Sequence, residues 1–143
     1  TSTSPSSLRV PAGAKAHTES VEHTFRKNVL LYSAQPHAHL RGRAAKFTAF
    51  FPDGREEVLL SVPKYDFNWQ TVYLFQEPKI LPAGTRIKFD MTWDNSAQNP
   101  ANPDPTKDVR WGDQTWDEMN TGFLRYRDLE PGENATAMIE ENK

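Results

Sequence analysis

The sequence predicts an all-β protein, in the form of a single-domain antiparallel β-sandwich of jelly-roll type. Three observations support this prediction. Segments between turn signals are short and rich in Val, Phe, Tyr, Trp and Thr; the clearest of them alternates apolar and polar residues; and no central segment has an apolar stripe of helical period. The same pattern allows a partly open barrel as the alternative. With 143 residues, the chain is long enough to form one hydrophobic core.

The clearest strand pattern covers residues 87–93. Ile87, Phe89, Met91 and Trp93 alternate with polar residues, which predicts a strand with one buried face. The other predicted strands share β-branched and aromatic residues between turn signals, and they cover 29–35, 47–51, 57–62, 70–75 and 121–127. The predicted turns share a proline two positions before a glycine, and they lie at 11–13, 52–54 and 82–84. The turn at 52–54 predicts a hairpin between the strands at 47–51 and 57–62.

Composition divides the chain into three parts. Residues 1–7 are rich in Ser, Thr and Pro and predict a flexible lead-in, 8–129 form the sandwich domain, and 130–143 form an acidic tail with weak helical tendency. Within the domain, 94–113 is dense in Asp, Asn and Pro, and a loop of this length is usually functional or disordered. Trp111 and Trp116 favour a packed loop, because aromatic residues are scarce in disordered segments.

Charge and composition exclude several classes of function. A net charge of −2 and a pI near 6.1 argue against a nucleic-acid-binding protein, which would present a basic face. With no cysteine, the chain has no disulfide framework, thiolate nucleophile, cysteine-type zinc site, iron–sulfur cluster or blue-copper centre. No apolar run reaches the roughly 20 residues of a membrane-spanning helix. The polar start, without Met, indicates a processed or truncated end rather than an intact signal peptide.

A His-x-His pair at His37 and His39 is the first feature that points to a metal. On a strand, residues i and i+2 face the same side, so two imidazoles could bind one ion. Alone the pair is a weak signal, since two surface histidines are the commoner explanation. The pair lacks the following Glu of a cupin, and the chain does not begin with the His of a histidine brace.

Two types of third ligand remain open from the residues alone. A zinc site would need a further nitrogen or oxygen ligand, from His17, His23 or an Asp. A thioether would instead favour Cu(I). Of the three methionines, Met91 is expected in the core and Met138 in the tail, whereas Met119 lies at a loop-to-strand junction.

Two segments of the sequence resemble one enzyme family. Residues 36–42 are Pro-His-Ala-His-Leu-Arg-Gly, and 111–119 are Trp-Gly-Asp-Gln-Thr-Trp-Asp-Glu-Met. In this order they resemble the His-x-His and Asp-Glu-Met segments of the copper type II, ascorbate-dependent monooxygenases. That family includes peptidylglycine α-hydroxylating monooxygenase and dopamine β-hydroxylase. Residues 62–70 and 94–107 look like the corresponding segments of bacterial relatives of that family. The likeness covers roughly 10–128 and matches the C-terminal of the family's two copper domains, an antiparallel β-sandwich.

The resemblance implies a site and an activity. His37, His39 and Met119 would hold one copper per chain, at which dioxygen reacts and an unactivated C–H bond of a small-molecule substrate is hydroxylated, with ascorbate or another reductant supplying electrons. It also implies an extracytoplasmic, periplasmic or secreted, location. Family enzymes have an N-terminal domain with a tri-histidine copper site, which the present sequence does not contain. The resemblance therefore implies half of an enzyme, whose partner is that domain or a larger assembly.

Other interpretations are kept beside this one. The chain could be a non-catalytic β-sandwich subunit or accessory domain that docks in a larger assembly, or a zinc or calcium module. Tyr65, Phe67, Trp69 and Tyr73 could form a carbohydrate-binding platform, although their odd-numbered spacing favours one buried strand face. The acidic residues at 113, 117 and 118 are expected to accept hydrogen bonds from backbone donors. Arg41 and Gln35 flank the histidines without an assigned role.

Overall fold

The computed structural model describes residues 7–141, so the predicted lead-in lies outside the described residues except for Ser7. The described chain contains nine strands and one short helix. The strands are β1 (Arg9–Val10), β2 (His17–Thr24), β3 (Val29–His37), β4 (Gly42–Phe50), β5 (Glu56–Val62), β6 (Tyr73–Leu81), β7 (Arg86–Trp93), β8 (Val109–Arg110) and β9 (Thr121–Asp128). The helix α1 (Ala135–Glu141) lies in the acidic tail. Within residues 7–141, no helix has the length and apolar character needed to cross a membrane.

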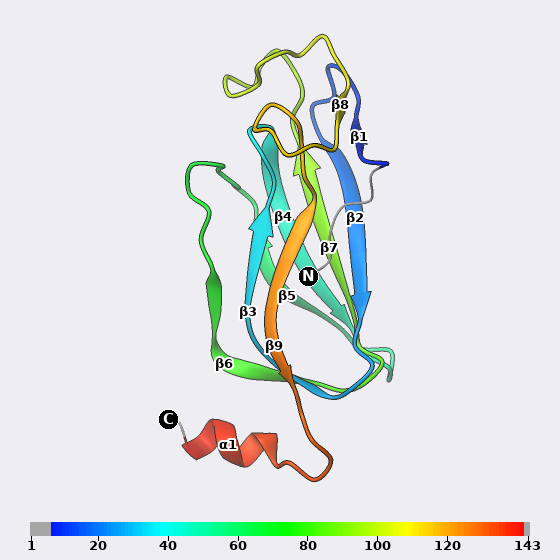
Figure 1. Ribbon diagram of the computed structural model, residues 1–143, viewed down its shortest axis with the longest axis vertical. Helices are drawn as coiled ribbons and strands as arrows, with labels where there is room; N and C mark the ends of the chain where they lie inside the picture. Colours follow the sequence, from blue (N-terminus) through cyan, green and yellow to red (C-terminus); the bar gives the residue numbers. More distant parts are fainter. Residues whose placement is uncertain (1–6, 142–143) are drawn as a thin grey trace.

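The strands form two main antiparallel sheets that pack into a sandwich, which confirms the predicted fold class (Figure 1). One sheet has the order β2-β7-β4-β5 and the other the order β6-β3-β9, while β1 and β8 form a small separate pair. Both sheets contribute buried apolar side chains to one cluster, which includes Leu31, Phe47, Phe89 and Met91. Met91 is thus a core residue, as the alternation predicts.

The predicted hairpin forms between β4 and β5, with Phe50 opposite Glu56. The three predicted turns each contain a glycine with positive φ, at Gly13, Gly54 and Gly84. Here the backbone adopts a conformation that side-chain-bearing residues avoid, so the turn signals identify the chain reversals correctly.

The short strands β1 and β8 were not predicted, β4 begins at Gly42 rather than at residue 47, and two further strands also differ from the prediction. β2 was not predicted, because Val21 is its one fully buried residue and an apolar–polar alternation is therefore hard to see. β6 was predicted at 70–75 but begins at Tyr73 and continues past Pro78 to Leu81. It lies at the edge of its sheet, where a proline removes no hydrogen bond from a second neighbour, and its pairing with β3 shifts register between Leu31 and Ser33.

β9 approaches the other sheet closely at Gly122. A Cβ atom added there would lie 2.8 Å from Phe47 Cε1 and 2.9 Å from Phe89 Cγ. Phe47 and Phe89 are opposite each other on β4 and β7, with ring centroids 4.5 Å apart, and both are fully buried. The glycine allows β9 to lie directly on this aromatic pair, which places the start of β9 beside the end of β3.

We expect Gly122→Ala to destabilise the protein by about 1–3 kcal/mol, because the added methyl group overpacks the two rings. Urea denaturation measures the change. Adding Phe47→Leu should recover part of the loss, giving a favourable coupling energy in a double-mutant cycle. If Gly122→Ala unfolds with the wild-type free energy, the sheets can move apart to accept the methyl group without loss of stability, and the prediction is wrong.

Candidate metal centre

The two histidines lie at the end of β3, close to the start of β9. The last pair in the register is His37 with Thr121. Met119 lies two residues before Thr121, in the segment that leads into β9. The imidazole centroids of His37 and His39 are 5.3 Å apart, with the rings nearly perpendicular at 81°.

The histidines are neighbours as the sequence predicts, but they do not share a strand. β3 ends at His37, and the chain then turns, with Gly42 N–H donating to the His39 carbonyl at 3.1 Å. His39 is buried in this turn and is held by contacts with residues 114–118. The two imidazoles are close together as predicted. The cause is the turn after β3, and not a shared face of one strand.

Gln70 fixes the orientation of the His37 ring. Gln70 Oε1 lies 2.6 Å from His37 Nδ1, and Gln70 Nε2 donates to the carbonyl of Phe67 at 3.0 Å. Because the amide nitrogen already faces a carbonyl, the oxygen is the atom that faces His37 and it can only accept. His37 Nδ1 therefore carries the proton, which leaves the lone pair of Nε2 available to bind a metal.

The backbone carbonyl of Asp117 does the same for His39. It lies 3.2 Å from His39 Nδ1, and a carbonyl can only accept, so Nδ1 again carries the proton. Burial lowers the pKa of His39, and the neighbouring His37 lowers it further, while the carbonyls of Asp117 and Gln114 act in the opposite direction. The ring is consequently held in its neutral, metal-binding form to lower pH than an ordinary histidine.

A fully buried carboxylate, Glu118, holds the backbone around His39. One of its oxygens accepts from His39 N at 2.8 Å and from Trp93 Nε1 at 3.0 Å, and the other accepts from Arg41 N at 2.8 Å. Burial raises the pKa of Glu118 to about 7, although these donors and the nearby Arg41 guanidinium lower it. This outcome agrees with the expectation that Glu118 accepts hydrogen bonds from backbone donors.

Arg41 ties the loop between β7 and β8, residues 94–108, to the histidine turn. Its Nε lies 3.1 Å from Asn95 Oδ1 and 2.8 Å from Asn102 Oδ1, and a terminal nitrogen donates to the Trp116 carbonyl at 2.8 Å. The loop is further tightened by side-chain oxygens that accept from the backbone two residues on, at Asp94, Asn99, Asn102 and Asp104.

The loop is held in place as predicted, but the two tryptophans are not what holds it. Trp116 is 60% exposed and Trp111 is 41% exposed. Arg41, Asn95 and Asn102 hold the loop through a buried polar network. The sequence contained this signal in its density of Asn and Asp, which stabilise turns through their side chains.

The loop between β5 and β6, residues 63–72, supports the site from its other side. The Tyr65 hydroxyl donates to the Ala38 carbonyl at 2.8 Å and accepts from Ala38 N at 3.1 Å, so it clamps the residue between the two histidines. Burial raises the pKa of Tyr65 to about 12, which keeps this hydroxyl protonated. The expected buried strand face is incorrect here, because the segment is a loop in which Tyr65 is buried and Trp69 is 76% exposed.

Aromatic rings flank the histidine pair. The Phe123 ring centroid lies 6.2 Å from that of His37, and the Phe67 ring centroid lies 6.2 Å from that of His39. Apolar surface therefore lies next to each imidazole.

The other potential ligands named from the sequence lie elsewhere. His17 Nε2 is 2.9 Å from Glu19 Oε1, and His23 packs on Phe25 and Tyr126. Met138 lies on α1, where its sulfur contacts Arg127. Among residues 7–141, no group of three or more His, Cys, Asp or Glu side chains is arranged to hold a metal ion. A metal at His37 and His39 would therefore need a third ligand of another kind, and the half-buried Met119 is the methionine in the adjoining segment.

The roles of Gln70 and Tyr65 were not predicted, although both lie in a segment that contributes to the family resemblance. Gln70 is 33 residues from His37 in the sequence, and nothing in the residues next to this glutamine indicates that it contacts His37.

No protein-family model matches the chain, and a comparison with curated proteins gives no significant match.

We expect Gln70→Leu to remove the preference of His37 for the Nδ1-protonated tautomer. Nitrogen-15 NMR of the metal-free protein reports the protonated nitrogen directly. Gln70→Glu keeps an accepting oxygen and should restore the wild-type tautomer, whereas Asn68→Leu, at an exposed amide of the same loop, should leave it unchanged. An Nε2-protonated His37 in wild type would contradict the geometry.

Proposed function

We propose that the chain binds one copper ion through His37, His39 and Met119 and is the substrate-hydroxylating half of a copper monooxygenase. The observation that carries the proposal is the pinning of both imidazoles through Nδ1 to accepting oxygens. Metal-binding histidines characteristically donate their second ring N–H to a carbonyl, carboxylate or water, which fixes the ring and presents the other nitrogen.

The donor set favours copper over harder metals. Two neutral imidazoles with a thioether suit Cu(I), whereas zinc and calcium sites favour additional nitrogen, thiolate or carboxylate ligands. The acidic side chains closest in sequence are already engaged, since Glu118 accepts three hydrogen bonds and Asp117 Oδ2 accepts from Gln114 N at 3.3 Å. They support the backbone of the site and leave the metal to the histidines and the sulfur.

Bound copper would supply the redox chemistry by which dioxygen hydroxylates a C–H bond. The protein's own contribution is to fix both imidazoles through Nδ1 and to flank the rings with Phe67 and Phe123. Hydroxylation that also forms water consumes two electrons from a reductant, for which the resemblance implies ascorbate and a second copper domain. That domain, or a larger assembly, is the proposed partner, and an extracytoplasmic location belongs to the same proposal.

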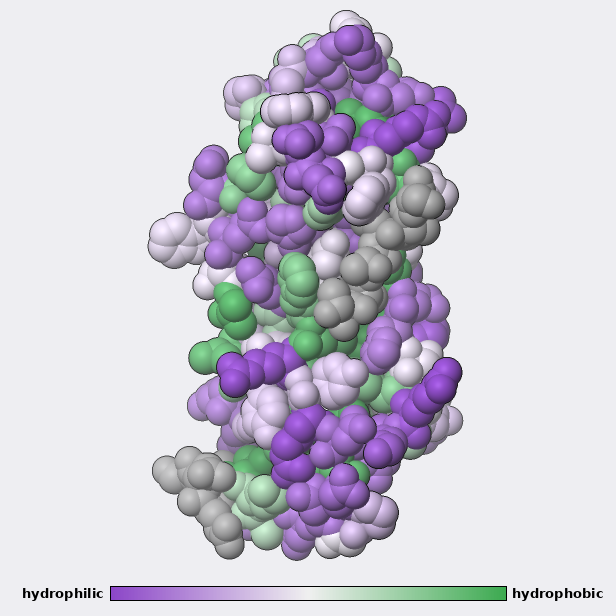
Figure 2. Space-filling view, in the orientation of Figure 1, coloured by the Kyte–Doolittle hydropathy of each residue, from purple (hydrophilic) through white to green (hydrophobic). Residues whose placement is uncertain are grey.

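A second candidate function is a non-catalytic docking module. Large apolar side chains are exposed along β6 and its neighbours, with Leu74 73% and Val72 50% exposed, and Ile80 and Phe123 also uncovered. Figure 2 shows apolar side chains gathered over β6 and β9 on one face of the molecule. Large exposed apolar patches on soluble proteins commonly mark interaction sites. This face of the molecule therefore favours association with a partner.

Copper binding tests the ligand assignment. We expect one copper per chain, and X-ray absorption of the Cu(I) form should show one sulfur neighbour that is lost in Met119→Leu. Met138→Leu, on α1, is the matched control and should retain the sulfur signal. A wild-type first shell of nitrogen and oxygen alone would remove Met119 from the site.

Acidification should weaken copper binding. Protons compete with copper for each Nε2, so below the pKa of a ring its contribution to affinity falls about tenfold per pH unit. Because burial lowers the pKa of His39, its share of the loss should begin at a lower pH than that of an ordinary histidine.

Competition titrations at several pH values measure this dependence. Met119→Leu should lower the Cu(I) affinity without changing the slope, because a thioether does not titrate. His37→Ala should remove the part of the slope that belongs to one proton. An affinity that stays flat in mildly acidic solution would show that histidines are not the ligands.

A further inference from the structure

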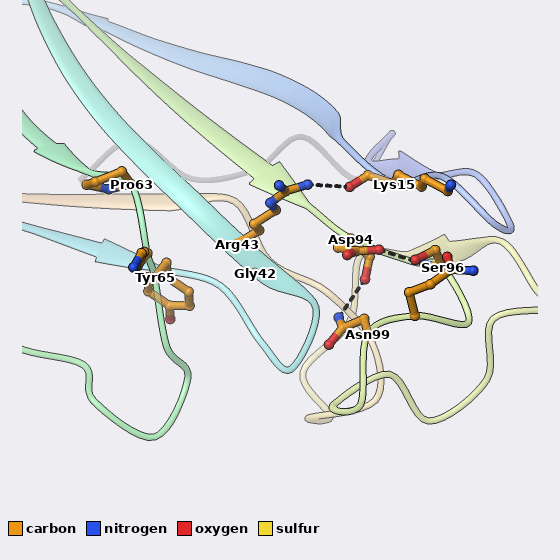
Figure 3. Close-up of a pocket in the computed structure, with 10 residues that line it drawn as sticks. Lys15, Gly42, Arg43, Pro63, Tyr65, Asp94, Ser96 and Asn99 are labelled. Carbon is orange, nitrogen blue, oxygen red and sulfur yellow. Dashed lines mark hydrogen bonds between the residues drawn. The ribbon is translucent and has the colours of Figure 1, made fainter.

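A basic hollow lies beside the histidine turn and is not used by the proposed copper chemistry (Figure 3). Its volume is about 620 Å³. Its walls come from four separate parts of the chain. These are Lys15 just before β2, the start of β4, the beginning of the β5–β6 loop, and the start of the β7–β8 loop. The polar lining includes Lys15, Arg43, Lys64, Asp94, Ser96 and Asn99.

Among residues 7–141, the cations of this hollow form no ion pair with a carboxylate. Salt bridges pair the Lys or Arg side chains at positions 9, 27, 41, 55, 79, 86, 88, 107 and 127 with Asp or Glu. Within residues 7–141, none of these ion pairs includes Lys15, Arg43 or Lys64. Three exposed cations without an ion pair among the described residues thus line one concave surface of a chain whose net charge is −2.

The hollow is held in shape by hydrogen bonds among its lining residues. A terminal nitrogen of Arg43 donates to the Lys15 carbonyl at 3.0 Å, which fixes the guanidinium at the edge of the hollow. The single carboxylate, Asp94, accepts from Ser96 N at 3.0 Å, and Asn99 Nδ2 donates to the Asp94 carbonyl at 2.7 Å. One carboxylate is therefore set against three cations, and the surplus charge is positive.

We propose that this hollow binds a small anion that also carries hydroxyl groups, of the sugar-acid class. Its volume lies in the range of small-molecule sites, roughly 300–1,000 Å³. Arginine and lysine donate charge-assisted hydrogen bonds to a carboxylate or phosphate. The exposed amide of Gln98, beside the half-buried amide of Asn99, supplies neutral donors and acceptors suited to hydroxyl groups.

The proposed ligand would lie on the far side of Tyr65 from the histidines. Tyr65 lines the hollow, and its hydroxyl holds Ala38 between His37 and His39. A Cβ on Gly42 would lie 2.7 Å from the Tyr65 ring, so glycine is needed where the hollow and the histidine turn meet. Anion binding does not require copper, and the two proposals can fail separately.

The experiment is a titration of the metal-free 143-residue chain with gluconate, with inorganic phosphate and with glucose, each in a separate series. Proton–nitrogen NMR and calorimetry monitor binding. Gluconate should bind more tightly than phosphate, glucose should not bind measurably, and the shifts should centre on the amides of Gly42, Arg43, Ser96 and Asn99. Arg43→Gln and Lys64→Gln should each weaken gluconate binding by about tenfold or more.

Arg26→Gln is the matched control, because this exposed arginine makes the same charge change in the β2–β3 turn, far from the hollow. It should alter gluconate affinity by less than about twofold, since exposed charges beyond about 8 Å are screened at physiological ionic strength. Thermal melts of each variant confirm folding. The proposal is overturned if Arg26→Gln weakens binding as much as Arg43→Gln, if glucose competes equally with gluconate, or if no saturable shift appears at the hollow.

Discussion

The buried carboxylate of Glu118 is the interaction on which the arrangement of the metal centre depends. It accepts hydrogen bonds from the backbone of His39 and Arg41 and from the indole of Trp93. These donors come from the histidine turn and from the core-facing end of β7, so one side chain joins the turn to the sandwich. An unsatisfied buried donor costs about 1–3 kcal/mol, which makes this carboxylate difficult to replace with any group that cannot accept on both oxygens.

The site forms at one end of the sandwich because three connections meet there. The β5–β6 loop supplies Tyr65 and Gln70, the β7–β8 loop is held by Arg41, and the segment before β9 brings Asp117. Each of these contacts involves a residue between 37 and 41. The sheets provide a fixed base, closed by Gly122 against the aromatic core, and the loops set the orientation of the two imidazoles.

Sequence patterns predicted the parts of the molecule whose signals are local. Alternation identified β7, Pro–Gly spacing identified the turns, and the His-x-His motif identified two rings that do lie side by side. The Gln70–His37 bond could not be predicted, because it joins residues far apart in the chain and depends on how a loop folds. β2 was missed because its buried face holds little apolar surface, and only the neighbouring β7 reveals it as a strand.

The β5–β6 loop connects the two chemistries proposed for this protein. Its first residues, Lys64 and Tyr65, line the basic hollow, and Tyr65 and Gln70 also hold the histidine turn. The indole of Trp69, between them in the chain, is largely exposed, whereas Phe67 packs against the core. A ligand that contacts Lys64 would lie next to the residue that clamps Ala38. Occupancy of the hollow and the preorganisation of the imidazoles therefore depend on the same short segment.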